Sequence, residues 1–206
     1  MQLAGIVLAG GQSTRMGGQD KCLLNLGGRT LLQRSVDKLA LQIDTIAINA
    51  NSDEDGYMHP GLPVLRDSFQ GFAGPLAGVL TGMEWAHMRG ASHVVTVAAD
   101  TPFFPDDFVA NMQTALSNQS GEIAIAETSD TSGKFFNHPT FGLWPVSLRD
   151  DLRGALDQGV RKVMQWVKPH GFVKVAFPAV PFDPFFNVNR PEDYEMAQIL
   201  LKEHSL

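Results

Sequence analysis

The chain has 206 residues, 44% of them hydrophobic, and a formal net charge of −6. This length suits one compact domain with a substantial core. The acidic balance argues against a general surface for nucleic acid. A single cysteine, Cys22, excludes an internal disulfide and is typical of a reducing compartment. The first apolar run has no basic segment before it and is too short to cross a membrane, so we expect a cytoplasmic protein without a membrane contact.

Apolar runs alternate with helical periodicity through the first 130 residues. We expect strands over 2–9, 45–51, 93–100 and 122–127, a brief extended piece over 64–68, and helices over 30–41, 75–88 and 105–116. Thr30 is a candidate N-cap, and Pro75 suits the first turn of its helix. This order of elements predicts an α/β fold with a mostly parallel central sheet and helices on both faces.

The pattern is looser after residue 130. A loop and hairpin are expected over 129–145, followed by helices over 147–158 and 160–167. A short strand at 186–189 and a closing helix over 190–203 complete the chain.

The segment LAGGQSTRMGGQDKCLL, over 8–24, follows the first strand and combines four glycines with Arg15 and Lys21. Glycines let backbone N–H groups approach an anion, and the two cations add charge and donors. Neither the Walker pattern nor G-x-G-x-x-G is present. The segment therefore indicates a small phosphorylated ligand, with a flexible turn carrying solvated charges as the alternative.

Three residues fall at strand ends: Gly10, Asn49 and Asp100. Ligands of parallel sheets bind beyond the carboxyl ends of the strands, so we expect these residues to face one crevice. Asp100 is suited to Mg²⁺, which prefers carboxylate, water and phosphate oxygens. It would otherwise cap the following turn or helix, and Asn49 would otherwise be an ordinary turn residue.

The segment over 8–24 resembles the signature of Rossmann-like nucleotidyltransferases, and most of all that of the molybdenum cofactor guanylyltransferases. The resemblance covers essentially the whole chain, and continues in NAN at 49–51, DS at 67–68, GPLAG at 74–78, ADTPF at 99–103, HPT at 138–140, GVRKVMQW at 159–166 and FNVN at 186–189. It implies a single nucleotidyltransferase domain over 1–206. About 1–130 would be the nucleotide-binding half, and about 131–206 the acceptor-side half.

The family resemblance implies transfer of GMP from GTP to molybdenum-molybdopterin, with Mg²⁺ as cofactor and pyrophosphate as the second product. The pterin phosphate is already an anionic nucleophile, so the protein would mainly position it and neutralise charge. Two alternatives stay open: a cytidylyltransferase that uses CTP to make the cytosine dinucleotide form of the cofactor, and a carrier of the finished cofactor that catalyses nothing. Contacts with molybdoenzymes or a delivery factor are compatible with any of these roles.

The resemblance also implies residue roles in the nucleotide site. Arg15, Lys21 and Asp100 are the expected catalytic residues, with the two cations on the triphosphate and Asp100 on the metal. The expected nucleotide contacts are Leu8, Ala9, Gly10, Gly11, Ser13, Lys21, Asn49, Asp67 and Asp100. The Asp67 carboxylate suits the N1–H and N2 amine of guanine, although backbone carbonyls are able to accept the same hydrogen bonds.

On the acceptor side the resemblance selects His138, Arg161, Lys162, Asn187 and Asn189. Taken alone, Arg161 and Lys162 are typical of a solvated helix face. His138, which precedes a proline, is typical of a loop. The resemblance is what makes these residues candidates for binding molybdopterin.

Overall fold

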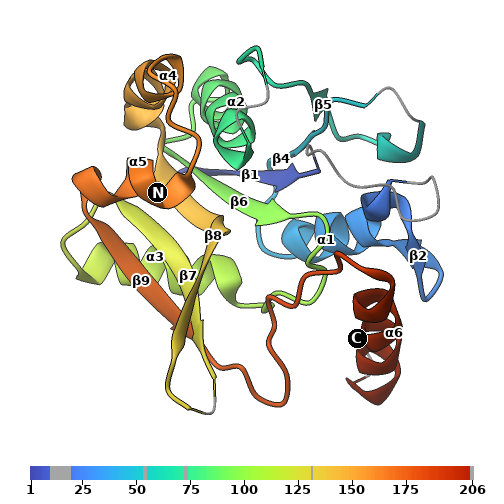
Figure 1. Cartoon of the computed structure of the whole chain (residues 1–206). Helices are drawn as coiled ribbons and strands as arrows, with labels where there is room; N and C mark the ends of the chain where they lie inside the picture. The colour runs from blue at the N-terminus through green and yellow to red at the C-terminus, as the bar shows by residue number, and fades with distance from the viewer. Residues whose placement is uncertain (10–19, 53–54, 72–73, 131, 205–206) are drawn as a thin grey trace.

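The structure is a computed structural model that describes residues 1–9, 20–52, 55–71, 74–130 and 132–204. Its centre is a seven-stranded sheet in the order β5-β4-β1-β6-β8-β7-β9 (Figure 1). The strands are β1 (Leu3–Leu8), β4 (Ile46–Asn49), β5 (Val64–Leu65), β6 (His93–Ala98), β7 (Ile123–Ser129), β8 (Phe135–Pro145) and β9 (Phe172–Phe177). A separate small hairpin pairs β2 (Asn25–Leu26) with β3 (Arg29–Thr30).

The sheet is mostly parallel, as the sequence predicts. Neighbouring strands pair in parallel from β5 through β4 and β1 to β6, and again between β7 and β9. Strand β8 is antiparallel to both of its neighbours, because it returns from β7 by a hairpin and inserts between β7 and β6. Strands from both halves of the chain therefore share one sheet.

Helices cover both faces of the sheet, which confirms the expected α/β architecture (Figure 1). One face packs against α1 (Leu31–Ala40) and α3 (Phe108–Asn118), and the other against α2 (Pro75–Met88), α4 (Arg149–Asp157) and α5 (Val163–His170). In β1, Val7 joins the first core while Ile6 and Leu8 join the second. A strand buried on both faces has a continuous apolar sequence, which explains the uninterrupted run at the N-terminus.

The residues that the sequence suggests as helix starts, Thr30 and Pro75, do begin α1 and α2. The Thr30 hydroxyl accepts from the Gln33 N–H at 3.0 Å, and the Gln33 side chain accepts from the Thr30 N–H at 2.9 Å. This capping box starts α1. Pro75 occupies the first turn of α2, directly after Gly74, whose φ of +66° favours glycine.

The second half differs from the sequence-based prediction in several elements. The segment 186–189 is not a strand, because the Val188 N–H bonds to the Asp100 carbonyl while the Asn189 N–H turns to the Asp193 side chain. The helix expected over 160–167 is α5, three residues further on, and the helix expected from 105 begins at Phe108. Strand β9 was not predicted, although its alternating burial from Val173 to Phe177 matches a period-2 pattern in the sequence.

The last helix, α6 (Pro191–His204), packs outside the two main layers. It shares a small core with Leu26, Leu31, Phe103 and Val188. Three short 3-10 helices complete the described elements: η1 (Lys21–Leu23), η2 (Asp55–Tyr57) and η3 (Val146–Leu148). Within the described ranges, no helix has both the length and the apolar character that a membrane crossing requires.

Candidate active site

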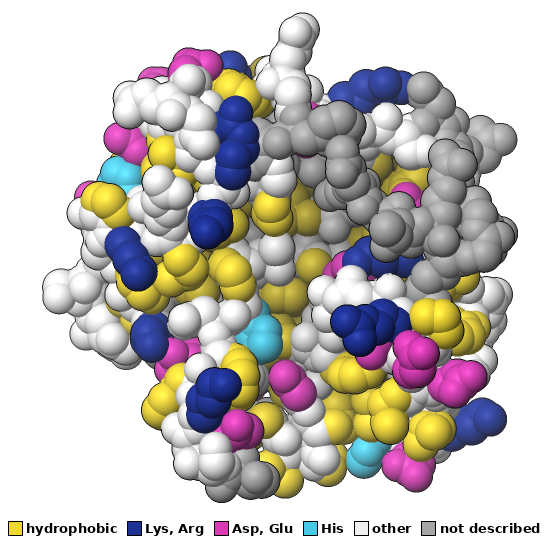
Figure 2. All heavy atoms as spheres, viewed as in Figure 1, with side chains coloured by type: hydrophobic (Ala, Val, Ile, Leu, Met, Phe, Trp, Pro, Cys, Tyr) yellow, Lys and Arg dark blue, Asp and Glu magenta, His cyan; other side chains and the backbone are white. Residues whose placement is uncertain are grey.

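A cleft lies at the carboxyl edge of the parallel strands. Ten described residues line it: Leu8, Asn49, Asp67, Gly74, Pro75, Gly78, Ala98, Asp100, Thr140 and Asn187. They come from the ends of β1, β4 and β6, from the start of α2, and from the second half of the chain. The face shown in Figure 2 is hollowed near its centre, with Lys and Arg side chains on both sides of the hollow. The cleft thus joins residues that the sequence assigned to nucleotide and to acceptor.

At one end of the cleft, Asp67 is held by two asparagines. Its Oδ1 accepts from Asn49 Nδ2 at 2.9 Å, and its Oδ2 accepts from Asn51 Nδ2 at 2.8 Å. The Asp67 N–H in turn donates to Asn51 Oδ1 at 2.9 Å. A carboxylate offers about four acceptor positions, so two remain after these bonds. The network fixes the carboxylate while leaving it able to accept from a ligand.

The start of α2 forms the wall beside this network. A Cβ on Gly78 would lie 2.4 Å from Asn49 Oδ1 and 2.7 Å from Leu8 Cδ2, so only glycine lets the helix approach so closely. Asn49 is 2% exposed as a result. The N-terminal end of a helix carries unpaired N–H groups and partial positive charge. The 14-residue helix α2 therefore directs a field that favours phosphate into the cleft.

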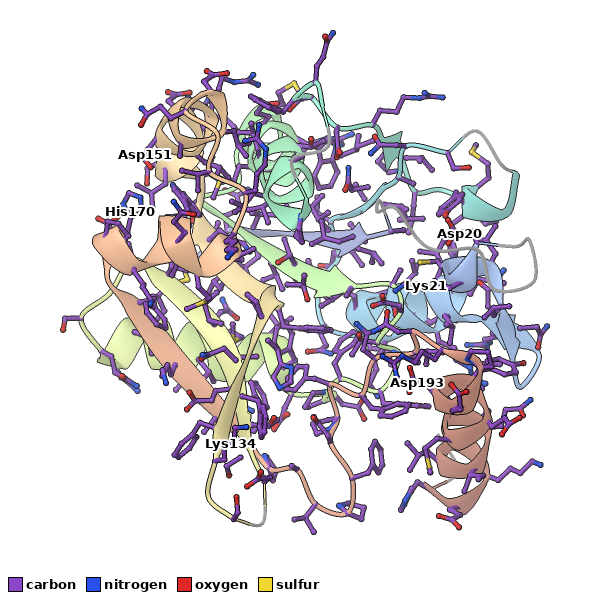
Figure 3. All side chains as sticks on the ribbon, in the orientation of Figure 1. Asp20, Lys21, Lys134, Asp151, His170 and Asp193 are labelled. Carbon is purple, nitrogen blue, oxygen red and sulfur yellow. The ribbon has the colours of Figure 1, made fainter. Side chains whose placement is uncertain are left out.

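Asp100, which lines the cleft, forms an ion pair. Lys21 Nζ lies 2.5 Å from Asp100 Oδ2 and donates to Asn189 Oδ1 at 2.5 Å. Figure 3 shows Lys21 on η1, with Asp193 at the start of α6. Asp193 accepts from the N–H groups of Asn189 and Arg190, which anchors the segment that presents the Asn189 side chain. Residues from the two halves of the chain therefore meet at one ammonium group.

Asp20, the acidic neighbour of Lys21, has another partner. Its side chain accepts from the Cys22 N–H at 3.0 Å and caps η1. Burial raises the pKa of the Cys22 thiol, and the charges of Asp100 and Asp20 add to this effect. The thiol is therefore protonated and belongs to the core rather than to the chemistry of the cleft.

The remaining nucleotide-side candidates divide into two groups. Leu8 lines the cleft, and the Ala9 N–H donates to the Asn49 carbonyl at 2.8 Å, which ties the end of β1 to the end of β4. Gly10, Gly11, Ser13 and Arg15 lie outside the described residues. Their proposed contacts with the triphosphate stay predictions from the sequence.

The acceptor-side candidates do not all reach the cleft. Asn187 lines it, and Asn189 contacts it through Lys21. Arg161 donates to the carbonyls of Leu156 and Val160, and its guanidinium lies 5.7 Å from the centre of the Phe69 ring. Arg161 is thus beside the segment that follows Asp67. Lys162 is exposed at the start of α5.

His138 lies deeper, on β8. Its Nε2 is 2.8 Å from Thr128 Oγ1, and its ring stacks on Phe185 with 4.5 Å between centroids. Burial lowers the pKa of His138, against an opposite effect of the Asp183 charge. His138 is therefore a neutral, packed side chain two residues from Thr140, which does line the cleft.

The sequence does not assign several residues of the site, among them Thr140, Gly78 and the positioning asparagine Asn51. Each of these three is inside a segment that carries the family resemblance: HPT, GPLAG and NAN. The residue type alone gave no signal, because a glycine in a helix or a threonine in a strand is commonplace. Only their places beside Asn49, Asp67 and Asp100 single them out.

The fold and the cleft define an α/β protein with its candidate site at the carboxyl ends of parallel strands. A model of the MobA-like NTP transferase domain matches residues 5–171, and the chain belongs to this family.

Similar proteins cover almost the whole chain. It is 47% identical over 206 residues to the molybdenum cofactor guanylyltransferase of Mesorhizobium japonicum, covering 97% of this chain and 96% of that one. It is 45% identical to the protein of that name from Rhodopseudomonas palustris, with 94% and 91% covered. Among solved structures, the molybdopterin-guanine dinucleotide biosynthesis protein A of Archaeoglobus fulgidus has a TM-score of 0.71 at 21% identity, covering 97% and 99% of the two chains. A 4-diphosphocytidyl-2C-methyl-D-erythritol synthase from Anaerococcus prevotii has a TM-score of 0.73 at 14% identity, with 98% of each chain covered, and shares the fold.

Proposed function

We propose that this protein transfers GMP from GTP to molybdenum-molybdopterin, which yields the guanine dinucleotide form of the cofactor and pyrophosphate. The observation that carries the proposal is that Asn49, Asp67, Asp100 and Asn187 line the same cleft. Relatives named molybdenum cofactor guanylyltransferase align with nearly the full chain, which supports this choice of substrates.

The base would bind at the Asp67 end of the cleft. A carboxylate held by Asn49 and Asn51 presents its remaining lone pairs in a fixed direction. Guanine offers two adjacent donors, the N1–H and the N2 amine, whereas adenine and cytosine do not offer this pair. A site built to pair with such donors rejects bases that leave its own polar groups unpaired. This arrangement supports GTP over ATP and CTP.

The reaction joins two anions, so charge has to be neutralised. An oxygen of the pterin's terminal phosphate would form a new bond to the α-phosphorus of GTP. The bond from that phosphorus to the β-phosphate oxygen would break, and its electron pair would leave with pyrophosphate. Lys21, which contacts the cleft residue Asp100, and the N-terminal end of α2, which lines the cleft, would stabilise the developing negative charge. The sequence-based prediction is that Arg15, together with Lys21, stabilises the departing pyrophosphate.

Asp100 is the proposed ligand of a Mg²⁺ cofactor. Its carboxylate lines the cleft and is a hard oxygen donor, which fits this ion. Among the described residues, no group of three or more His, Cys, Asp or Glu side chains is placed to hold a metal. A single protein carboxylate is sufficient, since Mg²⁺ usually completes its shell with water and substrate phosphates. When bound, the ion would neutralise charge on the triphosphate.

The test is incubation of the purified protein with GTP, Mg²⁺ and molybdenum-loaded molybdopterin. Chromatography with mass spectrometry follows the dinucleotide, and a coupled assay follows pyrophosphate. Equal release of both products supports the proposal. Product formation from CTP in preference to GTP would establish the cytidylyltransferase instead, and tight binding of the finished dinucleotide without pyrophosphate release would establish the carrier.

The metal proposal is tested separately from turnover. Binding of Mn²⁺ in the presence of GTP is measured by electron paramagnetic resonance in wild type and in Asp100→Asn. Loss of the bound Mn²⁺ signal in the folded variant is the expected result. An unchanged signal would remove Asp100 from the metal site.

A further inference from the structure

Strand β8 contains a bulge at the cleft. Its pairing with β7 places Ile125 opposite Gly142 and then Ala126 opposite His138, so residues 139–141 have no partner on β7. Its pairing with β6 ends at Thr96 and Gly142. Beyond that point, β8 has no ladder pairing with β6, and Thr140 and Asp100 both line the cleft. Bulges are a common means of redirecting a side chain beside an active site.

A buried chain of hydrogen bonds holds the bulge in place. Trp144 Nε1 donates to Thr96 Oγ1 at 2.8 Å, and Thr96 Oγ1 donates to the Thr140 carbonyl at 2.8 Å. Thr96 and Trp144 are both fully buried. A Cβ on Gly142 would lie 2.3 Å from the Trp144 ring, so this glycine makes room for the indole. The backbone of Thr140 is thereby fixed from within the core.

The Thr140 and Asn187 side chains differ from the other polar groups of the cleft. Within the described ranges, neither the Thr140 hydroxyl nor the Asn187 amide has a hydrogen-bond partner, although both line the cleft. Asn49, Asp67, Lys21 and Asp100 are already bonded to one another in two groups. Two polar groups that face the same cleft without a protein partner are available to a ligand.

The order of the strands indicates which ligand this is. The cleft residues follow the sheet from Asp67 after β5 and Asn49 on β4 to Leu8 on β1, Asp100 after β6 and Thr140 on β8. Neighbouring strands are about 4.8 Å apart, so Thr140 is roughly 14 Å from the Asn49 end and one strand beyond Asp100. A nucleotide whose base lies at Asp67 would place its α-phosphate near Asp100. Thr140 would then lie on the far side of the reacting phosphorus.

We propose that Thr140 is a substrate-binding residue for the acceptor: its hydroxyl, with the Asn187 amide, binds the non-bridging oxygens of the attacking phosphate and directs it towards the α-phosphorus. Thr96 and Trp144 are its positioning residues. This assignment rests on the proposed guanylyl transfer. The hydroxyl stays bonded to carbon throughout and only donates a hydrogen bond, so it adds no step to the reaction.

The experiment compares Thr140→Val, which keeps the shape and removes the hydroxyl, with Thr140→Ser, which keeps the hydroxyl. Steady-state rates are measured against molybdenum-loaded molybdopterin and against GTP, and calorimetry gives the Kd for GTP alone. Thr114→Val is the matched control, because it removes an exposed threonine hydroxyl on α3. Thr140→Ala serves in place of Thr140→Val if melting shows that the valine variant does not fold.

We expect Thr140→Val to lower kcat/KM for the acceptor by about 10- to 100-fold, the loss typical of one hydrogen bond to a charged group. The Kd for GTP should stay at the wild-type value, and Thr140→Ser should recover most of the activity. Thr96→Val, which removes the hydrogen bond to the Thr140 carbonyl, should give a smaller loss in kcat/KM for the acceptor.

Four results would overturn the assignment. These are wild-type rates in Thr140→Val, a weakened GTP Kd with an unchanged acceptor KM, equal losses in the valine and serine variants, and absence of dinucleotide formation by the wild-type protein. The last result also removes the proposed guanylyl transfer. The first three leave it intact, since the wild-type protein would still make both products.

Discussion

The close approach of α2 to β4 makes Gly78→Ala a direct test of the base end of the cleft. The new Cβ would lie 2.4 Å from Asn49 Oδ1, 2.7 Å from Leu8 Cδ2 and 3.2 Å from Asn49 Cγ. Ordinary contacts of a Cβ begin at about 3.4 Å. Asn49 therefore has to move by about 1 Å, and this movement breaks its hydrogen bonds to the Asp67 carboxylate and the Leu65 carbonyl.

The expected losses follow from these contacts. Overpacking of a tight site typically costs about 1–3 kcal/mol of unfolding free energy. The displaced Asn49 amide is 2% exposed, and a buried donor without its partner costs about 1–3 kcal/mol more. Asp67 loses one of its two asparagine partners, so its carboxylate is held less firmly. We expect GTP binding to weaken by at least about tenfold, equivalent to about 1.4 kcal/mol.

Calorimetry with GTP and urea unfolding measure the two effects separately. Gly82→Ala is the matched control, because its Cβ would lie 2.6 Å from Ile6 Cγ1, one turn further along α2 and away from the cleft residues. It should lose stability without losing GTP affinity. Gly154→Ala on α4 meets nothing within 4 Å and should lose neither. Wild-type GTP affinity in folded Gly78→Ala would refute the role given to Asn49 and Asp67.

Three further predictions concern separate parts of the molecule. Asp100→Asn should reduce turnover by about 10²–10³-fold while the variant still folds, and wild-type turnover in the folded variant would show that Asp100 has only a structural role. Burial lowers the pKa of His138 below its usual 6.5, so the unfolded chain takes up this proton first as pH falls. The stability that the neutral ring contributes is complete above about pH 6.5 and is lost below it. The melting temperature of His138→Gln should therefore fall less than that of the wild type between about pH 7 and about pH 5. An equal fall in the two proteins would contradict this. Thr30→Ala should lower the unfolding free energy by about 1 kcal/mol in urea titration while saturating activity stays unchanged, and an unchanged stability would show that the capping box on α1 contributes nothing.

Much of the fold depends on interactions between residues close together in the chain, and the sequence by itself therefore determined these parts. Thr30 and Pro75 marked the starts of two helices because a cap and a first-turn proline act within a few residues. The apolar runs before Asn49 and Asp100 marked parallel strands buried on both faces, and placed these side chains at one edge of the sheet. The class of site followed from these local signals together with the glycine-rich segment after β1.

Tertiary structure alone decided which polar groups meet. The antiparallel insertion of β8 between β6 and β7 is a long-range pairing, and it brings Thr140 to the cleft that Asp100 also lines. The contact of Lys21 with Asn189 joins residues 168 positions apart, which no short pattern encodes. The contact of Arg161 with Phe69 likewise joins distant parts of the chain, and the role of Arg161 with the acceptor stays a prediction. Side-chain partners across a sheet depend on strand order and register, and these are settled only when the whole core packs.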